Sequence, residues 1–280
     1  MAAVMVAARQ DATLVEPAAL GSGEAVIVDC RFDLTRPAAG REAWLAGHIP
    51  GALHLDLDRD LSAPRGEHGG RHPLPAAATF AATLARCGID RATPVIAYDD
   101  SGFAIAGRLW WMMRALGYRP PALLNGGYRG WLAAGGEPEA GEVAATACPV
   151  PVVDDYAGRL TIDDVRSAQA AGATLVDARS PDRYRGENET MDPVAGHIPG
   201  AENRFWGDAT DDSGRLLSDE ALTAHWGELL EAEQLVGYCG SGVSACINLF
   251  TLARLGRGDA QLYAGSWSDW CSYLPQEDSP

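Results

Sequence analysis

Short runs of apolar residues alternate along the chain with longer segments of helical periodicity. Continuous apolar runs are typical of strands that helices cover on both faces. The predicted strands are Ala25–Asp29, Val95–Tyr98, Ala122–Leu124, Thr174–Asp177, Leu235–Tyr238 and Gln261–Tyr263. The predicted helices are Ile105–Leu116, Asp219–Leu230, Val243–Leu255 and one that Thr161 opens, with Asp164 across its first turn. This alternation predicts an α/β fold with mainly parallel sheets, which bind ligands at the carboxyl ends of their strands.

The second half of the chain repeats the motifs of the first half in the same order. A Gly-His-Ile-Pro-Gly turn occurs at residues 47–51 and again at 196–200, and the segment 126–131 is echoed at 265–270. Self-similarity of this kind indicates a duplicated domain. Gly, Pro, Ala and Glu are frequent between the two copies, as expected of a linker. We therefore expect an N-terminal domain at residues 1–140, a linker at 141–158 and a C-terminal domain at 159–280.

The chain has 280 residues, enough for two domains, and a formal net charge of −16. So acidic a protein is a poor nucleic-acid binder, because phosphate binding needs a basic surface. No apolar run is long enough to span a bilayer, and residues 1–15 lack the basic start and long apolar stretch of a secretory signal. We expect no nucleic-acid or membrane partner and a cytoplasmic location.

Six cysteines are scattered through the chain without close pairs. Neither Cys-x-x-Cys nor His-Glu-x-x-His occurs, so we expect no disulfide framework and no zinc site. In a reducing compartment most of these thiols would be small buried hydrophobic groups. This interpretation covers Cys30, Cys87, Cys148, Cys246 and Cys271.

Cys239 has a different setting, because it lies between a predicted strand and a predicted helix. It heads the turn Cys-Gly-Ser-Gly-Val-Ser at residues 239–244. Backbone N–H groups converge at the start of a helix, where they favour a thiolate and lower the pKa of a cysteine. The two glycines let the backbone curl around the sulfur. The turn therefore predicts a nucleophilic thiolate at Cys239.

Features found in only one half are candidates for function, since shared features serve the fold. His48 and His197 occupy equivalent turns, which favours a structural role for both. The same reasoning applies to the Asp-x-Arg triplets at 29–31 and 177–179. Asp99 stands where the second half has Cys239, so the first half is predicted to be catalytically silent.

Two features of one half only remain after this comparison. Arg183 could bind a carboxylate or sulfonate in bidentate fashion, although a surface arginine is the commoner outcome of such spacing. The first half contains a segment at residues 55–75 that has no counterpart in the second half. This segment could overhang the loop of the other half or form only a polar, Gly-rich loop.

The paired Gly-His-Ile-Pro-Gly turns, the Asp of the first loop, the Cys-Gly-Ser-Gly-Val-Ser loop and the C-terminal Gly-Ser-Trp together resemble a tandem-domain rhodanese-type sulfurtransferase. The resemblance covers nearly the whole chain. It implies two tandem rhodanese-like domains, each a mainly parallel sheet flanked by helices. The uncharged loop is most similar to that of 3-mercaptopyruvate sulfurtransferases, because thiosulfate enzymes carry basic residues there.

The resemblance also implies roles for individual residues. Cys239 would take up sulfur as a persulfide, and Ser241 would work with His72 and Asp58 of the N-terminal domain. Arg183 matches the substrate-carboxylate arginine of the family. The second substrate arginine has no match before the second Gly-His-Ile-Pro-Gly turn, and the candidate substitute is Arg185. The remaining substrate-binding candidates are Gly240, Gly242, Val243 and Ser244.

We therefore expect sulfur transfer from mercaptopyruvate, a small anionic donor, through Cys239 to cyanide, a thiol or thioredoxin, without a metal or organic cofactor. The alternatives are a thiosulfate:cyanide sulfurtransferase, a non-catalytic persulfide carrier or sensor, and a phosphatase. The phosphatase is disfavoured, because related phosphatase loops end in an arginine, whereas residues 244–246 are Ser, Ala and Cys.

Overall fold

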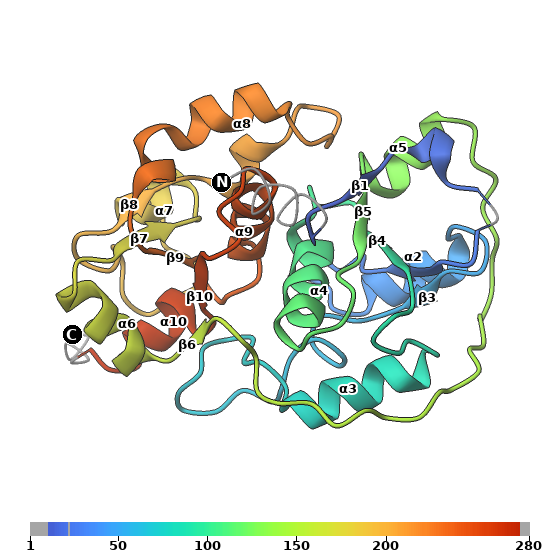
Figure 1. The fold of residues 1–280 in the computed structure, drawn as a ribbon, viewed down its shortest axis with the longest axis horizontal. Coiled ribbons are helices and arrows are strands. Elements are labelled where there is room, and N and C mark those ends of the chain that lie inside the picture. The colour runs from blue at the N-terminus through green and yellow to red at the C-terminus, as the bar shows by residue number, and fades with distance from the viewer. Residues whose placement is uncertain (1–10, 22, 275–280) are drawn as a thin grey trace.

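The computed structural model describes residues 11–21 and 23–274, which form two lobes with a five-stranded parallel sheet in each (Figure 1). The N-terminal sheet has the order β1 (Leu14–Val15), β5 (Ala122–Leu124), β4 (Val95–Tyr98), β2 (Val26–Asp29) and β3 (Leu53–His54). The C-terminal sheet has the order β6 (Arg159–Leu160), β10 (Gln261–Tyr263), β9 (Leu235–Tyr238), β7 (Thr174–Asp177) and β8 (Glu202–Asn203). The predicted α/β fold with parallel sheets is confirmed.

The sequence pattern located the three central strands of each sheet, and their observed bounds match the prediction within one residue. The strands that it missed are β1, β3, β6 and β8, which have two residues each and lie at the sheet edges. A two-residue strand is too short to carry a hydrophobic period. These edge strands are defined by their neighbours rather than by their own sequence.

Helices flank both sheets. They are α2 (Ala39–Ala46), α3 (Ala77–Arg86), α4 (Ala104–Ala115), α5 (Gly127–Ala133), α6 (Ile162–Ala170), α7 (Pro181–Tyr184), α8 (Asp219–Trp226), α9 (Ala245–Arg254) and α10 (Ser266–Cys271), with 3₁₀ turns η1 (Pro17–Ala19), η2 (Trp206–Ala209) and η3 (Gly227–Glu231). The predicted capping box of Thr161 and Asp164 is present at the start of α6. The predicted helix Asp219–Leu230 was wrong at residues 227–230, because α8 ends at Trp226 and the 3₁₀ turn η3 follows.

The two lobes meet along α4 and α9, which lie side by side in the middle of the molecule (Figure 1). Their contact is close at Gly107, where a Cβ would lie 3.3 Å from the backbone N of Ile247. Nearby, Trp110 packs edge to face on Phe250, with ring centroids 5.2 Å apart. The loops that precede α4 and α9 therefore face the same interface between the lobes.

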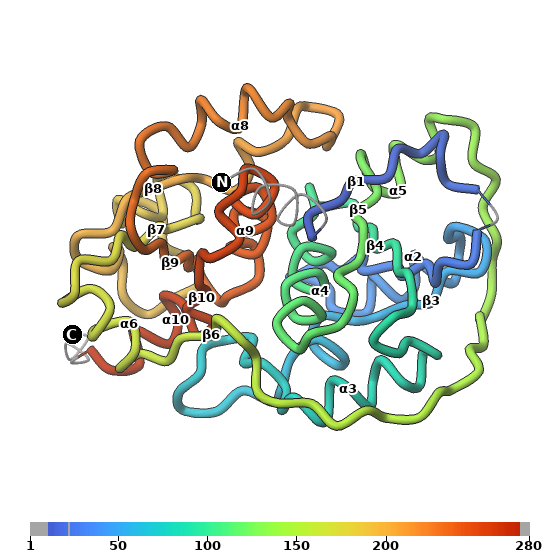
Figure 2. Tube along the Cα trace, in the orientation of Figure 1, coloured from blue at the N-terminus to red at the C-terminus, as the bar shows by residue number. Residues whose placement is uncertain are grey.

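The segment 134–158 crosses from one lobe to the other, and all of it is described without a helix or strand. It runs as an extended strap along the outside of the N-terminal lobe (Figure 2). Backbone hydrogen bonds of 2.9 Å tie it to that lobe, from Gly141 to Leu45 and from Cys148 to Ala85. The boundaries at residues 140 and 158 stay a prediction.

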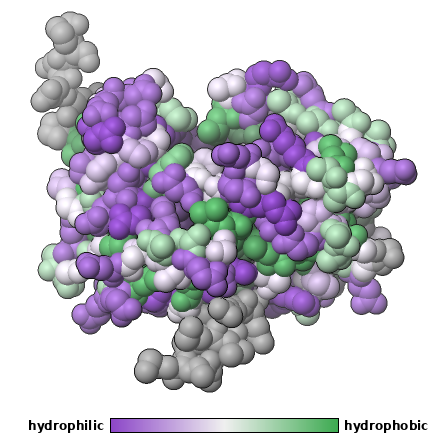
Figure 3. All heavy atoms as spheres, turned by 90° about the horizontal axis from the view of Figure 1, so that it is seen from above, coloured by the Kyte–Doolittle hydropathy of each residue, from purple (hydrophilic) through white to green (hydrophobic). Residues whose placement is uncertain are grey.

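Polar residues cover much of the face seen in Figure 3, and apolar residues form smaller patches, the clearest near the middle of that view. Within the ranges 11–21 and 23–274, no helix combines the length and apolar character needed to cross a membrane.

Candidate active site

Cys239 lies at the carboxyl end of β9, in the loop that leads into α9. All four residues of β9 are buried, so the start of this loop is anchored in the sheet. The helix begins only at Ala245, two residues later than predicted, because Val243 and Ser244 belong to the loop. Cys239 lines a cavity of about 710 Å³ between the lobes, with contributions from both. Its lining includes Phe32, Arg71, His72, Ile105, Arg183 and Phe205.

The pKa of the Cys239 thiol is lowered from its ordinary value. Burial opposes this shift, since the residue is only 2% exposed. Hydrogen bonds from the Ser244 hydroxyl and from the amides of Ser241 and Ala245 outweigh burial, because they stabilise the thiolate. The amides that the sequence led us to expect therefore face the sulfur.

Other cysteines have the opposite environment. Burial raises the pKa of Cys30 and Cys246, that of Cys87 to about 11 and that of Cys271 to about 12. These thiols stay protonated at neutral pH, so they are poor nucleophiles. In the described part of the chain, no group of three or more His, Cys, Asp or Glu side chains is arranged to hold a metal ion.

The glycines of the loop permit close approach of other groups. Gly242 has a φ of 74°, and a Cβ there would lie 2.1 Å from the carbonyl oxygen of Ala264. A Cβ on Gly240 would lie 2.7 Å from Arg71 Nη2. Glycine is therefore required at Gly242 by the backbone conformation and the nearby carbonyl oxygen, whereas a side chain at Gly240 would have to displace the guanidinium group of Arg71.

A chain of three polar side chains crosses the lobe boundary beside Cys239. Ser241 Oγ lies 2.8 Å from His72 Nδ1, and His72 Nε2 lies 3.5 Å from Asp58 Oδ1. Ser241 belongs to the C-terminal lobe, whereas His72 and Asp58 belong to the segment 55–75 of the N-terminal lobe. This segment overhangs the Cys239 loop, and the structure brings the three predicted residues together.

His72 is neutral at pH 7, because burial and nearby guanidinium groups, above all that of Arg108, lower its pKa to about 3. The Asp58 carboxylate faces Nε2 and favours the tautomer that carries its proton there. Nδ1 can then accept a hydrogen bond from the Ser241 hydroxyl. Burial raises the pKa of Asp58.

Two arginines, one from each lobe, lie against Gly240. Arg183 comes from α7, and its Nη2 would lie 3.4 Å from a Cβ on Gly240, while Arg71 approaches from the other lobe. Both guanidinium groups also bind Asp192, and Arg183 Nη2 lies 2.9 Å from Glu189 Oε1. Arg183 therefore lies beside the Cys239 loop with internal counter-ions. Arg71 was missed, although it adjoins His72 in the sequence.

Arg185, the candidate second substrate arginine, is not brought to the site. Its side chain is 53% exposed, its Nη2 pairs with Glu187 Oε2 at 2.7 Å, and it does not line the cavity. The helix α7 ends at Tyr184, and the chain turns Arg185 towards solvent. Val243 and Ser244, in contrast, both line the cavity.

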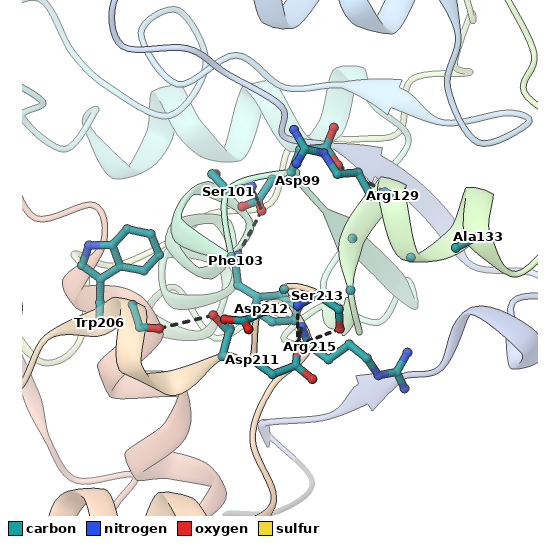
Figure 4. Close-up of a pocket in the computed structure, with 18 residues that line it drawn as sticks. Asp99, Ser101, Phe103, Arg129, Ala133, Trp206, Asp211, Asp212, Ser213 and Arg215 are labelled. Atoms are coloured by element: carbon teal, nitrogen blue, oxygen red, sulfur yellow. Dashed lines mark hydrogen bonds between the residues drawn. The ribbon is translucent and has the colours of Figure 1, made fainter.

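The equivalent loop of the N-terminal lobe holds a carboxylate in place of the thiol (Figure 4). The Asp99 carboxylate accepts backbone N–H groups at 2.9–3.0 Å from Ser101, Phe103, Ile105 and Ala106. Burial raises the pKa of Asp99, and the four amides act against that shift. The Asp99 carboxylate therefore occupies the backbone amides of this loop, which has no thiol at the position of Cys239. That this lobe is catalytically silent stays a prediction.

The polar motifs shared by both halves make the same contacts in each lobe. Arg31 Nη2 binds Asp29 at 2.6 Å, and Arg179 Nη2 binds Asp177 at 2.6 Å. The Nδ1 atoms of His48 and His197 each lie 2.7 Å from a backbone carbonyl oxygen. These contacts support the structural role expected for them.

Ser266 binds the backbone of the Cys239 loop, and it was not identified from the sequence. It is fully buried, its Oγ accepts the N–H of Cys239 at 3.1 Å, and it donates to the carbonyl oxygen of Tyr263 at 2.9 Å. The first half has Gly127 at the matching position. Comparing the halves at this position would have identified it.

Arg108 joins the two lobes behind the loop. Its buried guanidinium donates to the carbonyl oxygens of Gly242 at 2.9 Å, His72 at 2.8 Å and Leu61 at 3.0 Å. No carboxylate forms an ion pair with it among residues 11–21 and 23–274. Its charge also interacts favourably with the Cys239 thiolate. The signal in the sequence was a charge in the middle of the apolar helix 104–115, where Arg114, the other charge, lies in the last turn.

Known proteins resemble this chain over most of its length. The Rhodanese-like domain family matches residues 17–134 and 161–273. The SseB protein of Mycobacterium tuberculosis, named as a thiosulfate sulfurtransferase, is 43% identical over 250 residues, which cover 88% of this chain and 87% of that protein. The 3-mercaptopyruvate sulfurtransferase of Homo sapiens is 34% identical over 254 residues, which cover 86% of this chain and 84% of the human one.

Solved structures agree with these relationships. The structure of 3-mercaptopyruvate sulfurtransferase from Leishmania major has a TM-score of 0.84 and 32% sequence identity to this chain. The match covers 93% of this chain and 74% of that one. Both lobes therefore have the same family assignment, and the chain belongs to the tandem-domain rhodanese-type sulfurtransferases.

Proposed function

We propose that the protein transfers a sulfane sulfur from 3-mercaptopyruvate, through a persulfide on Cys239, to a thiophilic acceptor. The observation that carries this proposal is the stabilised Cys239 thiolate beside the Ser241–His72 hydrogen bond, at the wall of a cavity between the lobes. A lowered pKa increases the thiolate fraction at neutral pH, and the thiolate is the attacking species.

In the first stage the Cys239 thiolate attacks the sulfur of the donor. A sulfur–sulfur bond forms, the carbon–sulfur bond of mercaptopyruvate breaks, and its electron pair stays on carbon as the enolate of pyruvate. The amides around the sulfur stabilise the negative charge that remains on the persulfide. No external oxidant is needed, because the transferred sulfur is oxidised to the sulfane level while the donor carbon, which keeps the electron pair, is reduced to the methyl carbon of pyruvate.

The enolate needs one proton to leave as pyruvate. The thiol of the donor carries that proton, and the Ser241 hydroxyl, which is hydrogen-bonded to His72, can pass it on. His72 is neutral and accepts the Ser241 hydrogen bond, while Asp58 orients the imidazole. We assign these three residues to proton transfer and Cys239 to sulfur transfer.

A thiosulfate donor is the second candidate. The loop side chains of residues 240–243 carry no charge, which favours mercaptopyruvate over a more highly charged donor. The guanidinium groups of Arg71 and Arg183 beside Gly240 favour any small anion, however, and thiosulfate is one. The relative from Mycobacterium tuberculosis is named for that donor.

The acceptor completes the cycle by attacking the outer sulfur of the persulfide. Cyanide, a small thiol and thioredoxin are the acceptors that we propose, and the cavity gives small molecules access to Cys239. A persulfide carrier without turnover would load sulfur in the same way but would not release it to a small acceptor.

The test compares kcat/KM for mercaptopyruvate and thiosulfate, with cyanide and with a thiol as acceptors, on wild type and Cys239→Ser. We expect mercaptopyruvate to be the better donor and Cys239→Ser to be inactive with both. A higher kcat/KM for thiosulfate would replace the first candidate by the second. Sulfur loading without turnover would indicate a carrier.

A further inference from the structure

The helix α10 contacts both the Cys239 loop and the segment of the other lobe that carries His72. We infer that Asp269 of α10 is a positioning residue for sulfur transfer, because its carboxylate holds the segment 69–71 in the place from which His72 reaches Ser241. The inference rests on the proposed function, since it ties Asp269 to the proton transfer that mercaptopyruvate requires.

The start of α10 holds the Cys239 loop through three contacts. The backbone N–H groups of Trp267 and Ser268 donate to the carbonyl oxygens of the loop at 3.0 and 2.9 Å, the first to Cys239 and the second to Gly240. Ser266 Oγ adds the third contact, to the N–H of Cys239. The Cys239 loop is therefore fixed relative to α10.

Side chains of the same helix hold the segment 69–71 of the N-terminal lobe. Asp269 Oδ1 accepts the N–H of Gly69 at 2.6 Å, and Ser268 Oγ accepts the N–H of Arg71 at 3.0 Å. Asp269 is only 5% exposed, so its charge-assisted hydrogen bond is shielded from water. Both donors are backbone groups, and the contacts therefore fix the path of the chain that leads to His72.

Gly70 shows how closely the two lobes approach at this point. Its φ is 81°, and a Cβ there would lie 2.7 Å from Ser268 Oγ and closer still to the carbonyl oxygen of Gly265. A larger residue would therefore lift the segment from α10. Because His72 lies two residues further along the chain, a displacement at Gly70 would move its imidazole away from Ser241.

The N-terminal half lacks this arrangement. Arg129 and Gly130 stand where the second half has Ser268 and Asp269. Both line a cavity of about 610 Å³ beside the Asp99 loop (Figure 4). The half without the loop thiol therefore lacks both side-chain acceptors, as expected if these acceptors serve sulfur transfer.

A purely structural role is the opposing explanation, because Asp269 Oδ2 also accepts the hydroxyl of Tyr263 at 2.7 Å inside the C-terminal lobe. The two explanations predict a different dependence on the donor. Mercaptopyruvate leaves as an enolate that needs a proton, whereas sulfite leaves thiosulfate with the electron pair of the broken bond and needs none. A misplaced His72 would therefore slow turnover of mercaptopyruvate, while general damage to the lobe would slow both donors equally.

The first experiment measures kcat with saturating donor and acceptor, because displacing the segment also moves Arg71 and would raise KM for any anion. The variants Asp269→Ala and Gly70→Ala release the segment from opposite sides of the contact. In both variants the ratio of kcat for mercaptopyruvate to kcat for thiosulfate should fall about tenfold or more, as for a misplaced proton-transfer group.

Two further variants distinguish the contact with Gly69 from the rest of the Asp269 environment. Asp269→Asn keeps an acceptor oxygen for the N–H of Gly69 and should recover most of the lost kcat. Tyr263→Phe removes only the internal partner of Asp269, so it is the matched control. It should keep the wild-type ratio of kcat values even where its Tm is lower.

The second experiment does not depend on turnover. Diethyl pyrocarbonate acylates neutral imidazole rings that it can reach, and His72 is neutral at pH 7 but buried. Mass spectrometry of the peptide that contains His72 measures the rate of this modification. The rate should be low in wild type and Tyr263→Phe, and higher in Asp269→Ala and Gly70→Ala.

The outcomes separate the inference from the proposed function. If His72 becomes accessible as expected but wild type turns over no mercaptopyruvate, the positioning contact stands and the proposed function fails. The inference is overturned if kcat falls by the same factor for both donors, if kcat for mercaptopyruvate keeps its wild-type value, or if His72 stays protected. Gly70→Ala decides alone if Asp269→Ala does not fold.

Discussion

Gly127 and Ser266 occupy equivalent positions in the two halves and have the same backbone φ of 58°. At Gly127 a Cβ would lie 2.0 Å from the carbonyl oxygen of Asp99, so only glycine fits. The C-terminal half has a serine at this position, and Ser266 Oγ accepts the N–H of Cys239. A strained conformation that costs about 1–3 kcal/mol is thus retained where it supports the nucleophile.

We predict that Ser266→Gly and Ser266→Ala distinguish the effect of backbone strain at Ser266 from that of its hydrogen bond to Cys239. Both variants lose the hydrogen bond to Cys239, so kcat/KM should fall about tenfold in each. Ser266→Gly also relieves the left-handed strain, so its Tm should be higher than that of Ser266→Ala. Steady-state kinetics and thermal unfolding test this pair, and equal wild-type kcat/KM in both variants would contradict the supporting role.

The Ser244 hydroxyl is predicted to hold down the pKa of Cys239. Burial raises the pKa of Cys239, and the hydrogen bond from Ser244 is one of the contacts that lower it. In Ser244→Ala the pKa of Cys239 should therefore rise, and the thiolate fraction at pH 7 should fall. The rate of Cys239 alkylation by iodoacetamide, measured against pH, should have its midpoint at higher pH than in wild type. Ser268→Ala serves as the comparison, because Ser268 does not line the cavity. Coincident midpoints in Ser244→Ala and wild type would show that the hydroxyl is dispensable.

His72 should make the protein sensitive to acid. Its folded pKa of about 3 lies below the ordinary value of 6.5, so the unfolded chain binds a proton that the folded chain does not. Stability from this group is therefore complete above pH 6.5 and is lost as the pH falls towards 3, by at most about 1.4 kcal/mol per pH unit. Urea unfolding between these pH values should be less pH-dependent in His72→Asn than in wild type. Parallel pH profiles would rule out this linkage.

Arg108 should contribute to stability as well as to the position of the loop. In Arg108→Met the carbonyl oxygens of Leu61, His72 and Gly242 lose their donor in a buried site, which should cost about 3 kcal/mol or more in total. Arg86→Met is the control, since the Arg86 side chain is 67% exposed and its contacts with Asp60 and Thr83 are long, at 3.4 Å, so their loss should cost about 1 kcal/mol or less. A free energy of unfolding that is equal in the two variants would argue against this role.

The sequence predicted those features that are determined by residues close together in the chain. The central strands were predictable because both their faces are buried, and Cys239 because its turn joins a strand to a helix. Comparison of the halves singled out Arg183 and the segment that contains His72 and Asp58. The sequence predicted that the loop containing Asp99 lacks catalytic activity, but it did not predict that four backbone amides of this loop bind the Asp99 carboxylate.

The functional arginines that the sequence missed are placed by contacts between the lobes. Arg71 and Arg185 look alike in sequence, yet one faces Gly240 and the other faces solvent. Arg108 resembles a misplaced charge in an apolar helix until its three carbonyl partners come together from both lobes. Such partners are far apart in the chain, so no periodicity relates them.

The central claim is that the donor sulfur is transferred to the Sγ atom of Cys239. Its most direct test is the mass of the intact protein and of the Cys239 peptide after incubation with mercaptopyruvate and no acceptor, for wild type and Cys239→Ser. We predict that wild type gains one sulfur atom on this peptide, that cyanide removes it, and that Cys239→Ser gains none. A sulfur atom on another cysteine, or on Cys239→Ser, would contradict the account.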